Sequence, residues 1–459
     1  MTRVSFAFDW VDADGITGPE LAATWASLTI RVGDSVLTRV LDTRARTVRD
    51  FVYVPVYPLA EWLTTNWWFL THELENPVKR ADPNFRRRHA LGANREGYAF
   101  PDMEIVTTGA RTRLAWKSGP VPWTRLESLS SGEAWVESSE FRESCADLMD
   151  RVIRRLVSLG VDESFLQEEW AAIQTADEDE AMFCGTAAGL GWDPYDLEDD
   201  RKAQIFLLKD RLGDVLAEAV PALSANGLHD AEARNDIRDE WLAIPDAIAA
   251  AKSRSLVLKR LDRFGEEVSV NAELSGFDRR GDNGHAATVA LNPWEQGYAL
   301  ARRLRDALEL DEQPLPTMKS IANALGESPD ALSRVTRPVG VVQRAAMVDG
   351  VVTRNGVGDP AFAFRRLGAE SKRFYFCRAI AEVLSSTSAD ALLTKAQSER
   401  QQRNRAFAAE FLAPSAALRK RVSGPVVDGY EVDDLAAEFG VSSRVIEHQL
   451  PNHHIARVV

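Results

Sequence analysis

The chain has 459 residues, and its 45% hydrophobic and 27% charged content is typical of folded globular proteins rather than of disordered or fibrous ones. Its 55 basic and 69 acidic residues give a net charge of −14, which disfavours a surface that coats DNA or an anionic membrane as a whole. One basic patch could still bind either. The length exceeds one ordinary hydrophobic core and predicts roughly two to four domains.

Cysteine usage and the apolar segments predict a cytoplasmic protein with no membrane association. The three cysteines are far apart and form no C-x-x-C pair, which is typical of a reducing compartment. The N-terminus lacks a basic segment followed by an apolar one, so no secretory signal is expected. The longest apolar run, residues 51–70, contains Glu61 and two prolines. A buried strand followed by a buried helix explains this run better than a membrane span does.

The predicted fold class is α+β, beginning with a β-rich, tryptophan-containing domain over residues 1–135. Segments such as "VSFAFDWV" and "WASLTIRV" combine aromatic and β-branched residues with turn residues between them. Residues 58–75 have helical periodicity, and "PNFRRRHALGANREGYAFPD" is interpreted as a loop with a basic cluster at Arg86–Arg88. The tryptophans here are expected to lie mainly in the core, although exposed ones would mark a recognition surface.

The rest of the chain is predicted to form a helical domain, a mixed domain and a small helical module. Residues 136–273 carry helical periodicity almost throughout, and the polar, glycine-rich residues 274–288 form the best linker candidate. An α+β domain is expected over 289–425 and a helix-turn-helix-like module over 426–459. Because no glycine-rich nucleotide loop, EF-hand loop or nucleophile elbow is present, no cofactor is expected.

From residue 293 to the end, several segments occur in an order that resembles the ImmA/IrrE family of metallopeptidase-like proteins. The opening "WEQGYALARRLRDALEL" is followed by "MKSIANALGE", then by the strand and helix segment "VVTRNGVGDPAFAFRRLGAESKRFYFCRAIAEVL". "NRAFAAEFLAPSAAL" is similar to the family's FA-x-x-L-L-x-P helix end, with Phe407, Ala408, Leu412 and Pro414 in place. The resemblance implies a metallopeptidase fold ending in a helix-turn-helix-like module.

In active members of that family, the helix after "RF" carries H-E-x-x-H, in which two histidines bind zinc and the glutamate activates water. On this frame, Arg378 and Glu382 stand at the histidine positions and Ala379 stands at the general base. The third ligand falls on Gln401 or Arg403. Arginine offers no lone pair, and alanine cannot take a proton. The sequence therefore predicts no metal site and no catalysis there, and Arg378 and Glu382 are expected to form an ion pair along one helix.

Two segments have the pattern of a helix-turn-helix. Residues 318–335 place Gly326 in the turn and Ser328 at a cap, but the second helix offers few base-reading side chains. The C-terminal segment places Arg444, His448, Gln449 and Asn452 on its second helix, and these residue types can bind DNA bases. Its acidic first helix would face phosphates poorly. The cluster of His448, His453 and His454 is interpreted as a surface feature rather than a metal site.

Three functional hypotheses follow. The first is a catalytically inactive ImmA/IrrE-like protein that binds a protein partner as a cytoplasmic regulatory component. The resemblance implies a mobile-element, toxin–antitoxin or phage-defence setting for it. The second is a DNA-binding transcriptional regulator that uses the C-terminal module. The third is a metallo-endopeptidase with a rearranged site formed by Glu370, Glu382 and Glu399.

Overall fold

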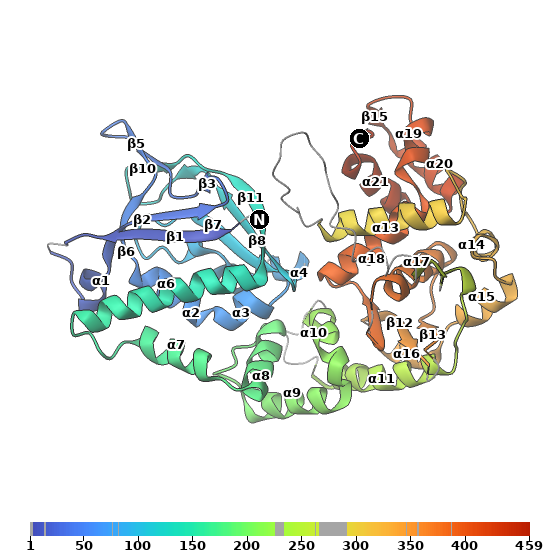
Figure 1. Cartoon of the computed structure of the whole chain (residues 1–459), viewed down its shortest axis with the longest axis horizontal. Helices are drawn as coiled ribbons and strands as arrows, with labels where there is room; N and C mark the ends of the chain where they lie inside the picture. The colour runs from blue at the N-terminus through green and yellow to red at the C-terminus, as the bar shows by residue number, and fades with distance from the viewer. Residues whose placement is uncertain are drawn as a thin grey trace. The chain divides into compact units, whose positions relative to one another are not determined.

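The computed structural model describes residues 3–459 apart from 13–14, 76, 81, 225–233, 262, 266–291, 346, 356–357 and 387. The chain forms two compact units, Met1–Phe206 and Leu207–Val459. The first unit is rich in strands and the second in helices, so the predicted α+β class is confirmed at that level (Figure 1). The predicted linker 274–288 lies outside the described residues.

The first unit contains three antiparallel sheets. The strands of the first sheet run in the order β1-β2-β3, and β6 also pairs with β2, along the edge opposite β1; the second sheet has the order β5-β4-β10-β9 and the third β11-β8-β7. The strands are β1 (Val4–Trp10), β2 (Trp25–Val32), β3 (Ser35–Val36), β4 (Val40–Asp42), β5 (Thr47–Arg49), β6 (Val52–Pro55), β7 (Asp102–Thr107), β8 (Arg111–Lys117), β9 (Gly119–Pro120), β10 (Leu126–Ser128) and β11 (Gly132–Glu137).

The helices of this unit pack beside its sheets. They are α1 (Pro19–Ala23), α2 (Tyr57–Thr65), α3 (Trp67–His72), α4 (Pro77–Arg80), α5 (Pro83–His89), η1 (Leu91–Ala93), α6 (Ser138–Ser158), α7 (Phe165–Thr175) and α8 (Glu178–Gly189), and α9 (Asp199–Leu212) crosses into the second unit. The apolar run 51–70 folds as a strand followed by two buried helices, where the sequence predicted a strand followed by one helix. None of the helices in the described part of the chain is long and apolar enough to cross a membrane.

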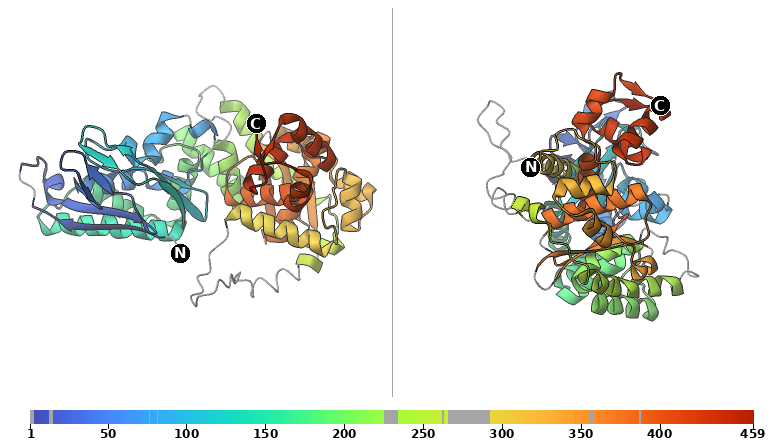
Figure 2. Two further views of the ribbon diagram at one scale, coloured as in Figure 1. Left: turned by 90° about the horizontal axis from the view of Figure 1, so that it is seen from above. Right: turned by 90° about the vertical axis from the view of Figure 1, so that its right-hand side faces the viewer.

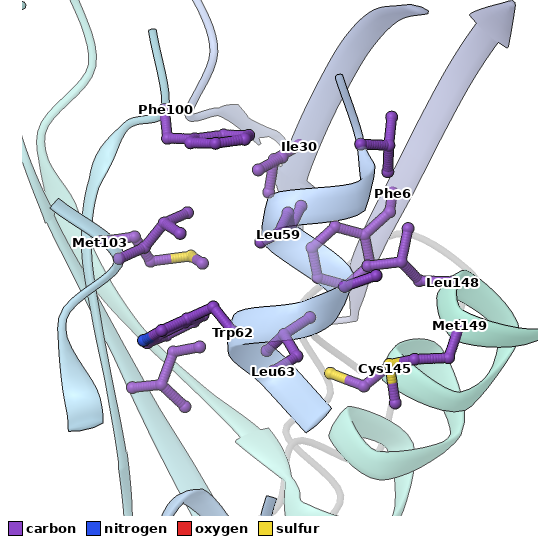
Figure 3. Close-up of a cluster of buried hydrophobic side chains, with 14 of the residues drawn as sticks. Phe6, Ile30, Leu59, Trp62, Leu63, Phe100, Met103, Cys145, Leu148 and Met149 are labelled. Atoms are coloured by element: carbon purple, nitrogen blue, oxygen red, sulfur yellow. The ribbon is translucent and has the colours of Figure 1, made fainter. Parts of the chain in front are cut away.

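The core of the first unit is formed by strands, α2 and α6 together (Figure 3). Figure 3 shows Leu59 and Leu63 of α2 between strand residues such as Ile30 and the α6 residues Cys145 and Leu148. Because α6 buries its apolar stripe against these strands, it belongs to the strand-rich unit. The predicted boundaries at 135/136 and 273 therefore differ from the observed division after Phe206.

One local prediction in this unit was wrong. Residues 83–89 form helix α5 rather than a loop. Asp82 caps the helix by accepting the backbone N–H of Asn84 at 2.8 Å, and Pro83 occupies its first turn. An acidic cap followed by proline is a helix-start signal.

The second unit is built around a three-stranded antiparallel sheet of order β13-β12-β14. Its strands are β12 (Val348–Arg354), β13 (Pro360–Phe364) and β14 (Asp390–Thr394), and β15 (Val426–Val427) pairs in parallel with β16 (Arg457–Val458). The helices are η2 (Gly213–Val215), α10 (Leu216–Ser224), α11 (Arg234–Lys252), α13 (Pro293–Ala307), α14 (Met318–Leu325), α15 (Pro329–Val335), α16 (Gly340–Arg344), α17 (Ala369–Ser385), α18 (Glu399–Leu412), α19 (Ser415–Arg421), α20 (Gly429–Phe439) and α21 (Ser443–Asn452).

Close packing of α13 on α18 is central to the second unit. A Cβ atom at Gly297 of α13 would lie only 2.3 Å from the carbonyl oxygen of Arg403 and 2.9 Å from the backbone nitrogen of Phe407. Glycine is therefore needed for the two helices to approach. The C-terminal helices, coloured dark red, lie together in both views of Figure 2. This packing places α17, α18 and β14 side by side, where the degenerate metal motif was predicted.

Candidate functional site

Helix α17 carries the segment that resembles a metal-binding helix. It begins after Gly368 and ends at Ser385. Its apolar residues Phe376, Cys377 and Ile380 are fully buried in the core of the second unit. Ala379, at the position of the general base, is also fully buried among these side chains. A methyl group in a packed core can neither accept a proton nor hold a water molecule.

Arg378 is almost completely buried, with only 1% of its surface exposed. One guanidinium nitrogen donates to the carbonyl oxygen of Thr394 at 2.7 Å and to the side-chain oxygen of Gln401. The guanidinium carbon lies 4.7 Å from the centre of the Tyr375 ring. Burial lowers the pKa of Arg378, but arginine begins from so high a value that it remains a cation at neutral pH. Arg378 therefore places a positive charge at the position that the resemblance aligns with the first metal ligand.

Gln401 joins Arg378 to the end of strand β14. Its side-chain oxygen also accepts the backbone N–H of Thr394 at 3.2 Å, and its amide nitrogen donates to the carbonyl oxygen of Leu392 at 2.6 Å. The resemblance to the metallopeptidase-like family predicted Gln401 or Arg403 at the third ligand position. The structure brings Gln401 to Arg378, so these two positions do meet.

Glu382 has partners of its own. Its carboxylate accepts a hydrogen bond from the side-chain amide of Asn404 at 2.6 Å and forms an ion pair with Arg400. Burial raises the pKa of Glu382, and burial lowers the pKa of Arg400 to about 10. The predicted ion pair between Arg378 and Glu382 is wrong. Both side chains are described, and they bond to other elements: Arg378 to Thr394 of β14 and Gln401 of α18, and Glu382 to Arg400 of α18.

Asp349 and Tyr375 extend this network towards strand β12. The Tyr375 hydroxyl donates to the Asp349 carboxylate at 2.5 Å, and Arg365 pairs with the same carboxylate at 3.4 Å. Burial raises the pKa of Tyr375 to about 12, so its hydroxyl stays protonated. We call Asp349, Tyr375, Arg378, Glu382, Arg400, Gln401 and Asn404 the α17–α18 polar cluster.

The α17–α18 polar cluster has the composition of a structural network rather than of a catalytic one. No group of three or more histidine, cysteine, aspartate or glutamate side chains in the described residues could hold a metal ion. A rearranged site using both Glu370 and Glu382 is excluded because twelve residues of helix separate them, about 18 Å along the axis. A small recess beside Glu382 is lined by Arg354 and Ser386. Arg354 there already donates to the carbonyls of Val383 and Ser386 at the end of α17.

Sequence reasoning missed Arg400 and Asn404 as partners of Glu382. A signal for Asn404 was present in the sequence. Gln401 and Asn404 stand at helical spacing with Phe407, Ala408 and Phe411, and all five are buried. Polar residues that continue an apolar helical face are expected to meet polar groups in the core.

The C-terminal module is a pair of helices, as predicted. Asp428 and Glu431 form a capping box at the start of α20, Gly440 ends the helix in the left-handed conformation, and Ser442 precedes α21. Arg444, His448 and Asn452 are exposed on α21, and their four-residue spacing places them along one face. Gln449 is 1% exposed and lies in the interior, so it leaves the set of candidate DNA-binding residues.

Gln449 belongs to a second buried network, centred on Glu410. The Glu410 carboxylate accepts hydrogen bonds from Gln449 at 3.1 Å and Arg302 at 2.8 Å, and His453 lies 3.2 Å from it. Burial raises the pKa of Glu410, but the nearby His453 ring and the hydrogen bond from Arg302 outweigh burial and lower the pKa to about 2. Through Glu410 of α18, this network links Gln449 of the C-terminal module to Arg302 of α13. It also corrects the surface interpretation of His453, which is buried.

The segment 318–335 forms α14 and α15 with Gly326 between them, and Ser328 caps α15 by accepting the N–H of Asp330 at 3.3 Å. Arg254 donates to the carbonyl oxygens of Arg334 and Arg337 at 2.6 and 2.7 Å, so it caps the end of α15. These contacts are those of a packed helix pair.

The first unit also contains a buried charged cluster. Glu73 and Lys79 have fully buried side chains, with 2.8 Å between the Lys79 amine and the carboxylate, which also accepts bonds from Arg88 and His89. Burial raises the pKa of Glu73, but hydrogen bonding to His89 and the Lys79 charge lower it below its usual range overall. Because Lys79, Arg88 and His89 all bind the Glu73 carboxylate, we interpret this cluster as structural.

No protein-family profile matches the chain, and neither curated proteins nor solved structures show a significant similarity to it. The functional interpretation of α17 and α18 therefore depends on the chain's own residues and geometry.

Proposed function

We propose that this chain is a catalytically inactive ImmA/IrrE-like protein that acts as a cytoplasmic interaction or regulatory component. By the same resemblance, its setting is a mobile element, a toxin–antitoxin pair or phage defence, and its partner is a protein. The observation that carries the proposal is the meeting of Arg378 with Gln401 and of Glu382 with helix α18. Residues at positions that the resemblance aligns with metal ligands bond to neighbouring side chains, Arg378 to Gln401 and Glu382 to Asn404 and Arg400.

Metal content tests the catalytic part of the proposal. We expect the purified protein to contain far less than one zinc ion per chain by elemental analysis. A variant that restores the motif, R378H/A379E/E382H/Q401E, is expected to bind about one zinc ion, because two neutral imidazoles and a carboxylate would then converge. The control variant, R378H/A379E/E382H, keeps Gln401. It is expected to bind zinc at least about tenfold more weakly than the restored variant, since one ligand is missing. A folded restored variant that binds no zinc would falsify the correspondence of these positions.

Partner capture tests the interaction part. We expect the tagged chain, purified from its native host, to retain one protein in a fixed ratio. That complex is expected to survive nuclease and chelator treatment, because neither nucleic acid nor metal holds it together. Recovery of the chain alone under mild conditions, or loss of the partner after nuclease treatment, would contradict this function.

DNA binding by the C-terminal module is the second candidate, favoured by the exposed row Arg444, His448 and Asn452 on α21. Arg444→Ala should then weaken salt-dependent binding to the gene's own promoter. Arg366→Ala removes the same charge from an exposed position elsewhere and serves as the control. Equal effects of the two substitutions would reject a specific role for α21.

A further inference from the structure

Two turns lie side by side at one end of the sheet β5-β4-β10-β9. One joins β4 to β5 through residues 43–46, and the other joins β9 to β10 through residues 121–125. The backbone N–H and the hydroxyl of Thr43 both donate to the carbonyl oxygen of Arg125, each at 2.9 Å. The labels β5 and β10 mark this sheet in Figure 1. We call residues 43–46 and 121–125 the arginine–tryptophan tip.

The arginine–tryptophan tip is positively charged and carries an exposed aromatic ring. Arg44, Arg46 and Arg125 are exposed, and 88% of Trp123 is exposed, although tryptophans of this domain were expected mainly in the core. Neither turn contains an acidic residue. Asp42, at the end of β4, accepts the backbone N–H groups of Ala45 and Arg44 at 2.9 and 3.0 Å. Three arginines therefore gather at one point of a chain whose net charge is −14.

The backbone of the tip is strained at two of these residues. Arg46 has φ = 53° and Trp123 has φ = 58°, both in the left-handed region that favours glycine. The N–H of Thr124 donates to the carbonyl oxygen of Val121 at 3.2 Å, which closes a turn with Pro122 and Trp123 at its centre. Glycine is the favoured residue at the third position of such a turn. Trp123 thus fits its turn poorly and buries little surface within its own chain.

We propose that the arginine–tryptophan tip binds single-stranded nucleic acid. Guanidinium groups pair well with phosphates, and an exposed indole offers a flat face on which an unpaired base can stack. A duplex keeps its bases stacked inside, and an acidic peptide has no flat ring to match Trp123. Strained residues that persist on a surface concentrate where they bind a ligand. The inference is independent of the state of the α17–α18 polar cluster.

Fluorescence anisotropy of the full-length protein with a labelled single-stranded oligonucleotide of about 20 nucleotides, as DNA and as RNA, tests this proposal. We expect tighter binding of single strands than of duplex, with log Kd rising by about 2 per tenfold increase in salt, as expected for three phosphate contacts. Trp123→Gly and Arg46→Gly should each weaken binding, the first by about tenfold. Both should leave the Tm unchanged or raise it, because glycine suits both turns.

Two control variants change similar exposed side chains elsewhere, and both should leave binding unchanged. Tyr430→Ala removes a ring that is 84% exposed, and Arg154→Ala removes an exposed charge on α6. The proposal fails if the protein binds no single strand at low salt, binds duplex as tightly, or retains full binding after Trp123→Gly. It also fails if a polyglutamate peptide competes as well as the oligonucleotide, or if Arg444→Ala abolishes binding while the tip variants do not.

Discussion

Arg378 carries a positive charge into the interior of the second unit, where it lies beside the buried polar side chain of Gln401. Two oxygen atoms accept hydrogen bonds from its guanidinium, the Thr394 carbonyl oxygen and the Gln401 side-chain oxygen. A metal ligand must offer a lone pair, whereas Arg378 offers only N–H donors. Arg378 thus gives α17 a buried cation rather than a ligand for one.

Arg378→Met keeps the length and the apolar stem of the side chain but removes its donors. The Gln401 oxygen and the Thr394 carbonyl would then lose a buried donor, and we expect a loss of about 2–4 kcal/mol in the free energy of unfolding. Urea denaturation measures this loss. Lys372→Met on the same helix is the control and should change stability by less than about 0.5 kcal/mol, because Lys372 is only half-buried. A loss below about 1 kcal/mol for Arg378→Met would contradict a structural role for the cation.

At the scale of elements, helices α13, α17, α18 and α21 are held together by close backbone approach and by buried carboxylates. Gly297 permits the approach of α13 to α18, and Glu410 collects donors from three other segments. Each of these two features can be tested separately.

Gly297→Ala inserts one methyl group where α13 meets the backbone of α18. Because the neighbours are the Arg403 carbonyl and the Phe407 nitrogen rather than flexible side-chain ends, the helices must separate. We expect a loss of about 2–3 kcal/mol in stability. The control is Gly340→Ala, where a Cβ meets nothing within 4 Å. Thermal unfolding of both variants measures the difference, and equal Tm values would show that the helix contact is not as tight as described.

Glu410 predicts a specific acid sensitivity. Its pKa is lowered from 4.5 to about 2 in the folded protein, so the unfolded chain binds the proton more readily. The stabilisation is present above pH 4.5 and is lost as pH falls towards 2, a contribution of roughly 3 kcal/mol. Glu410→Gln should lower stability at neutral pH and remove this part of the pH dependence. Glu447→Gln, at an exposed position of α21, should keep the wild-type profile. Parallel profiles for wild type and Glu410→Gln would refute the assignment.

At the scale of the whole molecule, two hydrophobic cores share no residue. The first gathers side chains from Val4 to Ala188, and the second gathers side chains from Leu258 to Ala456. Each unit therefore has its own source of cooperative stability.

Tryptophan distribution allows the two cores to be observed separately. Ten of the 12 tryptophans lie in residues 1–206, so tryptophan fluorescence reports mainly on the first unit, whereas circular dichroism reports on both. We expect Gly297→Ala to shift the urea midpoint of part of the circular dichroism signal and to leave the fluorescence midpoint unchanged. A common shift of both signals would mean that the chain unfolds as a single cooperative unit.

The sequence predicted most elements of the candidate site but not their partners. Helical spacing located α17 and α18, and the capping residues located both pairs of short helices. The same spacing predicted that Arg378 would pair with Glu382, because residues four apart on a helix are neighbours. That expectation was wrong because both side chains are buried. Buried polar groups bond to the polar atoms that packing places beside them, and for Arg378 and Glu382 these atoms belong to α18 and β14.

Local patterns by themselves determined the α+β character and the helix pair at the C-terminus. These depend on side-chain chemistry and on periodicities of two or 3.6 residues, which the chain carries without reference to its fold. Only the tertiary structure decided that α6 joins the strand-rich core, that Gln449 is buried against Glu410, and that Trp123 is exposed beside three arginines. Each of these depends on residues far apart in sequence that packing brings together.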